Sequence, residues 1–221
     1  MYSLIIDLNI AGKLVIVVGG GTEGTRKVKS LLGQNCKIIV VSNRLNKFLL
    51  GLAEEGKIDI VKTILKDASV LDRFEKPFLI LAATNDRELN RKLVQKAKQI
   101  GAFAYAADDP SVSDFIHPAV INIDDTIFIA ISTKGRSPAM ARTLRIRVER
   151  VLKRLIKKED VDYIKLASFA RSAARNSLKD PDSRKKFLYT VIKDSKIKNF
   201  IKNKKFEDAK SAAMEILEGW A

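Results

Sequence analysis

The chain has 221 residues, of which 46% are hydrophobic, and its 41 basic against 26 acidic residues give a formal charge of +15. This length allows one full domain and a smaller partner, the apolar content excludes disorder as the overall state, and the single cysteine excludes an intramolecular disulfide or a cysteine-based zinc site. No apolar run reaches the ~20 residues of a membrane-spanning helix, and the N-terminus lacks signal-peptide features, so we expect a cytoplasmic protein without membrane contact.

The first hundred residues alternate strand and helix patterns. Short apolar, β-branched runs predict five strands, at 14–18, 38–41, 58–62, 78–82 and 102–106. Amphipathic stretches between them predict helices at 23–32, 45–54 and 86–100. Strands that alternate with helices are typical of a doubly wound parallel sheet with right-handed crossovers, so we expect an α/β domain.

The pattern changes after residue 112. Two β-branched runs, 120–123 and 126–132, are joined by Asp124-Asp125 and predict an antiparallel hairpin. Its open edges require a partner. A long helix is expected to begin at Ser137, which serves as N-cap, with Pro138 in the first helical position.

The last third of the chain reads as helical and strongly basic. From about Glu159 onward we expect only short helices, interrupted at Asp180-Pro181 and near Asn203. The sequence therefore predicts three parts: a dinucleotide-binding domain at 1–112, a hairpin with a long helix at 113–157, and a small basic helical domain at 158–221.

A glycine-rich turn follows the first predicted strand and opens the first predicted helix. It contains G-x-G-x-x-G as Gly19, Gly21 and Gly24. In that context Gly19 permits the tight turn, Gly21 admits a pyrophosphate close to the backbone, and Gly24 allows close helix–strand packing. The helix N-terminus supplies N–H groups and a positive dipole. The motif predicts a bound dinucleotide, the alternative being a glycine-rich turn without a ligand.

The acidic residue that usually holds the adenosine ribose is missing after the second strand. The sequence there is Ser42-Asn43-Arg44. Ser42 or Asn43 could bind a ribose hydroxyl, and Arg44 either accepts a 2′-phosphate or is an ordinary surface arginine. The choice between NAD and NADP stays open on these residues alone.

Two further segments follow strands at the same sheet edge. Thr84 comes after the fourth strand, where it either contacts the cofactor or helps to cap the next helix. Asp108-Asp109 follows the fifth strand, where a carboxylate is placed for proton transfer and where paired carboxylates can raise one pKa. The alternative is a common turn sequence. His117, the only histidine, is expected to be structural or on the surface.

A polar and basic loop precedes the long helix. It combines serine, threonine and glycine with cations at a helix N-terminus, which predicts an anion site or, alternatively, a capped helix start with incidental charge. The candidate anion-binding residues are Thr133, Lys134, Arg136, Ser137, Arg142 and Arg145.

Together these motifs resemble the siroheme-synthase family of precorrin-2 dehydrogenases and sirohydrochlorin ferrochelatases. The resemblance runs in order from about Leu8 to Arg150, and the loop ending in Gly135-Arg136-Ser137-Pro138 is specific to the family. It departs from the family at Tyr105, where asparagine is usual, and at His117, where a larger apolar residue is common.

The resemblance implies a Rossmann domain, a central dimerisation region and a helical C-terminal domain in a homodimer. It implies oxidation of precorrin-2 to sirohydrochlorin with NAD, followed in some members by Fe²⁺ insertion. Asp108 matches the family's catalytic aspartate, and Thr22, Glu23, Asn43 and Arg44 match its NAD-contacting positions. The basic loop and tail would attract the carboxylates of the tetrapyrrole.

Two other functions compete with this hypothesis. A non-catalytic NAD-sensing module with a basic partner-binding tail would bind the cofactor without turnover. A nucleic-acid binder would show steep salt dependence, but the aromatic content is only 7% and the basic residues are not interleaved with aromatics, so we do not expect nucleic acid as a partner.

Overall fold

The computed structural model describes residues 4–220, and residues 1–3 and 221, which belong to the ends of the predicted first and last parts, lie outside that range. The chain forms two compact units. The sheet unit extends to His117 and includes Lys134–Arg136, and the helical unit contains Pro118–Thr133 and everything from Ser137 onward. The predicted three-part division stays a prediction.

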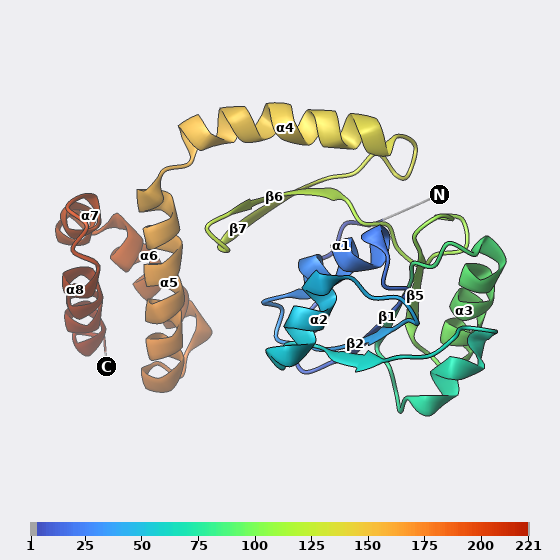
Figure 1. The fold of residues 1–221 in the computed structure, drawn as a ribbon. Coiled ribbons are helices and arrows are strands. Elements are labelled where there is room, and N and C mark those ends of the chain that lie inside the picture. Colours follow the sequence, from blue (N-terminus) through green and yellow to red (C-terminus); the bar gives the residue numbers. More distant parts are fainter. Residues whose placement is uncertain (1–3, 221) are drawn as a thin grey trace. The chain divides into compact units, whose positions relative to one another are not determined.

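The sheet unit is built on a parallel five-stranded sheet in the order β3-β2-β1-β4-β5 (Figure 1). Val18 at the end of β1 pairs in register with Val41 of β2 and Ala82 of β4, so the loops that leave these strands start at one edge. The strands are β1 (Leu14–Val18), β2 (Lys37–Val41), β3 (Asp59–Val61), β4 (Leu79–Ala82) and β5 (Phe103–Ala106). The predicted doubly wound α/β fold is confirmed.

Helices cover both faces of this sheet because side chains of successive strand residues point to opposite sides. Val15 and Val17 pack with helices α1 and α2, whereas Ile16 and Val18 pack with α3 and a 3₁₀ turn that the sequence did not predict. The helical elements are α1 (Thr22–Leu31), α2 (Lys47–Glu54), the 3₁₀ turn η1 (Ala68–Arg73) and α3 (Arg87–Gln99).

The helical unit opens with the predicted hairpin of β6 (Ala119–Ile123) and β7 (Ile127–Ile131), paired antiparallel. Three residues, 124–126, connect the paired Ile123 and Ile127, and Asp124 and Asp125 among them both have positive φ. Helix α4 (Pro138–Leu155) follows, and the side chain of Ser137 accepts a hydrogen bond from the Met140 backbone N–H, which confirms the predicted cap.

Four helices complete the unit: α5 (Lys158–Ser177), α6 (Pro181–Lys193), α7 (Ser195–Lys202) and α8 (Phe206–Glu218). The expectation of short helices only was wrong for α5, which has 20 residues, because buried Val161, Leu166, Ala170 and Ala174 recur along it and sustain one packing face. No helix within residues 4–220 is long and apolar enough to cross a membrane.

Candidate functional site

The glycine turn after β1 is folded against the neighbouring strands. Gly19 has φ +114°, and a Cβ there would lie 2.3 Å from the carbonyl oxygen of Ala83. A Cβ on Gly24 would lie 1.9 Å from the carbonyl oxygen of Gly19, so α1 can approach the turn only with glycine at this position. These two contacts give Gly19 and Gly24 the turn and packing roles that the motif predicts.

Gly21 differs from these two glycines because a Cβ on it would meet nothing within 4 Å. It is the N-cap of α1 and makes no side-chain capping bond, and Thr22 beside it is exposed. Open space beside uncapped N–H groups at the positive end of a helix suits a phosphate, so these residues fit a dinucleotide pyrophosphate. Glu23, also predicted here, forms ion pairs with Arg26 at 2.7 Å and Lys27 at 3.6 Å.

The segment after β2 separates the three predicted ribose candidates. Ser42 is buried, and its hydroxyl donates to the Arg44 carbonyl at 2.8 Å while accepting from the Arg44 N–H at 3.2 Å, so it shapes the turn. Asn43 and Arg44 are exposed. Ser42 therefore stabilises the turn through backbone hydrogen bonds. Contacts of Asn43 and Arg44 with the cofactor stay a prediction.

A buried asparagine links the end of β4 to the aspartates after β5. Asn90 of α3 is 1% exposed, and its Oδ1 accepts from the Thr84 backbone N–H at 3.1 Å and from the Thr84 hydroxyl at 2.7 Å. Because Oδ1 is engaged by two donors, the amide is oriented so that Nδ2 donates to Oδ1 of Asp108 at 2.8 Å. These hydrogen bonds of Asn90 to Thr84 and Asp108 form what we call the Asn90 clamp, in which Thr84 holds Asn90 in place. The Asp86 side chain caps α3.

Asp108 and Asp109 occupy very different environments. The Asp109 side chain is 6% exposed and accepts from Nη2 and Nε of Arg91 at 2.8 and 3.2 Å and from the Ser111 hydroxyl. The Ser111 and Arg91 donors hold the pKa of Asp109 well below its usual range, so the expectation that pairing raises a carboxyl pKa fails for this residue. Asp109 shapes the loop.

Asp108 keeps one oxygen available. Its Oδ1 is held by Asn90, its Oδ2 lies 3.8 Å from Nε of Arg87, and the side chain is 33% exposed. A carboxylate anchored through one oxygen and open at the other is suited to exchange a proton with a ligand at the carboxyl edge of the sheet. Of the two neighbours, Asp108 has the geometry of a general base.

Lys27, Tyr105, Phe115 and His117 form a cluster, and its Tyr105 is within electrostatic reach of Asp108. The Lys27 side chain is 4% exposed, and its ammonium lies 4.0 Å from the Tyr105 ring centroid. Burial lowers the pKa of Lys27 to about 8. The His117 ring packs 4.8 Å from the Tyr105 centroid; the residue keeps an exposed edge, but desolvation of the ring by these neighbours, together with the charge of Lys27, lowers the His117 pKa to about 4. His117 is therefore neutral at pH 7.

The predicted anion-binding residues divide between the two compact units. Lys134 and Arg136 belong to the sheet unit, where they line a hollow of about 220 Å³ with Pro110, Ser111 and Ile116. The other four belong to the helical unit, and their part in binding stays a prediction: Thr133 and Ser137, joined by two hydrogen bonds, exposed Arg142, and Arg145, paired with Glu149 at 2.6 Å.

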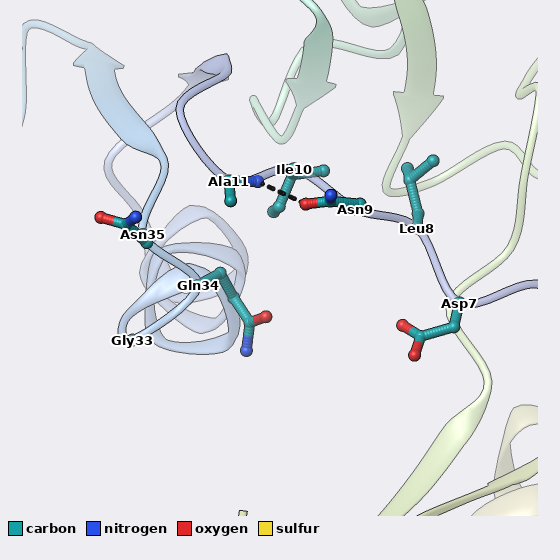
Figure 2. Close-up of a pocket in the computed structure, with 8 residues that line it drawn as sticks. All are labelled: Asp7, Leu8, Asn9, Ile10, Ala11, Gly33, Gln34 and Asn35. Atoms are coloured by element: carbon teal, nitrogen blue, oxygen red, sulfur yellow. Dashed lines mark hydrogen bonds between the residues drawn. The ribbon is translucent and has the colours of Figure 1, made fainter. Parts of the chain in front are cut away.

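A second hollow, of about 370 Å³, lies at the end of the sheet where β1 and β2 begin (Figure 2). It is lined by residues that precede β1 and β2, including Asn9, Ala11 and Asn35, and the Asn9 side chain accepts from the Ala11 backbone N–H at 3.1 Å. Ligands of open α/β sheets bind at the carboxyl ends of the strands, so this hollow is separate from the candidate site.

Sequence reasoning missed the residues that orient the predicted ones. It assigned no role to four residues: Lys27, Arg87, Asn90 and Arg91. The spacing of three of them gave a partial signal, because positions 87, 90 and 91 lie on one face of the predicted helix. Within residues 4–220 no three histidine, cysteine or acidic side chains gather as a metal site.

Comparison with known proteins connects this geometry to curated relatives. The siroheme synthase of Neisseria meningitidis serogroup C (strain 053442) is 32% identical over 213 residues, which cover 96% of this chain and 42% of that protein. The siroheme synthase of Nitrosococcus oceani is 31% identical over 222 residues, covering 99% of this chain and 45% of that protein. The chain spans less than half the length of these relatives.

Structure comparison supports the same fold. A solved structure titled "SirC, precorrin-2 dehydrogenase" matches with a TM-score of 0.67 at 22% identity, covering 97% of this chain and 100% of that one. A family model described as NAD(P)-binding matches residues 6–119, which include the glycine turn, the Asn90 clamp and Asp108. Because this match covers more than half of the chain, the protein belongs to that NAD(P)-binding family.

Proposed function

We propose that this protein oxidises precorrin-2 to sirohydrochlorin with NAD, as a step of siroheme biosynthesis. The observation that carries the proposal is Asp108, held through one oxygen by Asn90 and open at the other. Contacts connect it to the glycine turn, because Asn90 binds Thr84 and the preceding Ala83 carbonyl lies against Gly19. A base and a dinucleotide turn at one sheet edge suit a dehydrogenase.

The residues divide the chemistry as follows. Gly21 and Thr22 would hold the pyrophosphate, with Asn43 and Arg44 near the adenosine end. When bound, NAD accepts the hydride from the tetrapyrrole. Asp108 takes the accompanying proton on Oδ2, and Asn90 keeps the carboxylate in position. Asp109, engaged by Arg91 and Ser111, supports the loop and takes no proton.

The basic residues of the sheet unit would orient the substrate. Precorrin-2 carries many carboxylates at its rim, and Lys134 and Arg136 line a hollow against the loop that begins at Asp108. Fe²⁺ insertion would take place at the same site, with Asp108 accepting the two pyrrole protons one after the other and passing each to solvent as the metal substrate enters. A hard carboxylate can act as that base.

The proposed assembly is a homodimer formed through the hairpin and α4. The exposed face of the hairpin carries Val120, 42% exposed, and Phe128, 56% exposed. Exposed apolar residues also recur at helical spacing along α4, at Met140, Leu144, Val151 and Leu155. A two-stranded hairpin with open edges and an apolar helical stripe needs cover, which a second copy of the chain would supply.

The dimer is tested by sedimentation equilibrium of the wild type and Phe128→Lys. We expect the wild type at twice 24.7 kDa and a dissociation constant raised at least about tenfold in the variant, because a charge would enter an apolar interface. Tyr189→Lys, a substitution of a 56% exposed residue in the α5–α8 region, serves as the control. A wild type that remains monomeric contradicts the assembly.

The activity is tested by mixing the protein with enzymatically prepared precorrin-2 and NAD without oxygen, and recording NADH and sirohydrochlorin absorbance. Fe²⁺ or Co²⁺ is then added. We expect NADH in proportion to sirohydrochlorin, followed by metal-dependent loss of sirohydrochlorin. NADH without that loss would limit the enzyme to dehydrogenation. NAD binding without any NADH would contradict the proposal and favour the sensing module.

A further inference from the structure

Two arginines one helical turn apart on α3 reach the Asp108–Asp109 pair. Of these two carboxylates, Arg91 contacts Asp109, through Nη2 at 2.8 Å and Nε at 3.2 Å. Arg87 lies between the carboxylates, with Nε 3.8 Å from Oδ2 of Asp108 and Nη2 3.6 Å from Oδ2 of Asp109. The two cations therefore hold different positions relative to the candidate base.

Asp109 does not depend on Arg87. Its buried carboxylate already has the two bonds from Arg91 and two from Ser111, whose backbone N–H donates to Oδ1 at 3.0 Å and whose hydroxyl donates to the same oxygen. Both contacts of Arg87 are longer than a hydrogen bond, and its side chain is 66% exposed. Such an exposed pair stabilises a fold weakly, so Arg87 is free to change partners at little cost.

The candidate base lies next to this exposed guanidinium. Its Oδ1 accepts a hydrogen bond from Asn90, Oδ2 is the oxygen nearer to solvent-exposed Arg87, and the Arg87 Nε lies 3.8 Å from it. A substrate that approaches Oδ2 therefore comes within reach of the Arg87 guanidinium. A substrate bearing carboxylates offers the guanidinium a planar, bidentate partner at the same place.

We propose that Arg87 is a substrate-binding residue: its guanidinium lies beside Oδ2 of Asp108 in the free enzyme and turns onto a carboxylate of the tetrapyrrole when the substrate is bound. This inference rests on the proposed function, because it takes Asp108 as the base and a polycarboxylate as the substrate. It adds a contact on α3 to those predicted for the basic loop, and it gives Arg87 and Arg91 separable roles.

The test compares Arg87→Gln, Arg87→Lys and the matched control Arg91→Gln. We expect Arg87→Gln to raise KM for precorrin-2 about tenfold, the loss of one charge-assisted contact, with kcat within about twofold. Arg87→Lys keeps the positive charge but loses the bidentate geometry of the guanidinium, so we expect its KM to lie between those of the wild type and Arg87→Gln. Arg91→Gln lowers Tm and leaves KM within about twofold. The Kd for NAD, measured by calorimetry, is unchanged in all three.

The inference is overturned if Arg87→Gln leaves KM unchanged, or if Arg91→Gln raises KM as much. Its failure is distinguishable from that of the proposed function. A wild type that turns over precorrin-2 while Arg87→Gln behaves identically removes only the role of Arg87. A wild type that neither turns over precorrin-2 nor binds sirohydrochlorin in an absorbance titration removes both.

Discussion

The buried ammonium of Lys27 makes a quantitative prediction about stability and pH. Its pKa is lowered from 10.5 to about 8, chiefly by burial and against the favourable charge of Glu23. In the unfolded chain Lys27 holds its proton up to about pH 10.5, so between pH 8 and 10.5 the unfolded state binds more protons than the folded state. Stability from this residue is therefore gained as pH rises through that window and lost as pH falls through it.

The magnitude follows from the size of the shift. A difference of about 2.5 pKa units corresponds to about 3 kcal/mol once the window has been crossed, at 1.36 kcal/mol per unit. Between about pH 7 and about pH 9.5, the titration of Lys27 increases the free energy of unfolding by about 2 kcal/mol. Lys27→Met removes the titration and keeps much of the side-chain volume, so it is the appropriate comparison.

The assay is urea unfolding of the wild type and Lys27→Met at these two pH values, followed by far-UV circular dichroism. We expect the free energy of unfolding of the wild type, relative to the variant, to increase by about 2 kcal/mol at the higher pH. The single tryptophan, Trp220, packs on Phe187 in the helical unit, so its fluorescence transition serves as an internal control. Equal pH dependence in the two proteins would refute the reasoning.

Two further predictions concern the glycine turn and the Asn90 clamp. Gly24→Ala places a Cβ 1.9 Å from the Gly19 carbonyl oxygen, so we expect a loss of about 2 kcal/mol or more in stability and at least a tenfold higher Kd for NAD by calorimetry; unchanged binding and Tm would contradict this packing. Asn90→Ala leaves the Thr84 donors and Asp108 Oδ1 without their partner. We expect a loss of about 2 kcal/mol in the free energy of unfolding, seen as a lower Tm, and turnover at least about tenfold slower; full activity would contradict the orienting role.

The sequence predicted the strands and the glycine turn well because both follow from local patterns. Runs such as Val15–Val18 are buried on both faces of a parallel sheet, and Gly19 and Gly24 sit where a Cβ would collide with backbone. The long α5 was missed because its buried positions carry alanine at 170 and 174, which gives a weak apolar signal although the helices pack closely there.

The chemistry of the site was only partly predictable. A sequence places Asp108 and Asp109 side by side but does not say which one is buried against Arg91 and which is left open, because that depends on α3 packing beside β5. Asn90 and Lys27 likewise gain their roles from neighbours 18 and 78 positions away, at Asp108 and Tyr105. Long-range packing, not local pattern, assigns those roles.

The proposed base is tested most directly by Asp108→Asn beside Asp109→Asn in the anaerobic precorrin-2 and NAD assay. We predict that Asp108→Asn keeps its Tm and its Kd for NAD while NADH formation falls at least about 100-fold, because the proton acceptor is lost. Asp109→Asn, which removes the charge of a buried carboxylate from its pair with Arg91, is predicted chiefly to lower Tm. An Asp108→Asn variant that forms NADH at the wild-type rate would contradict the assignment of Asp108 as the base.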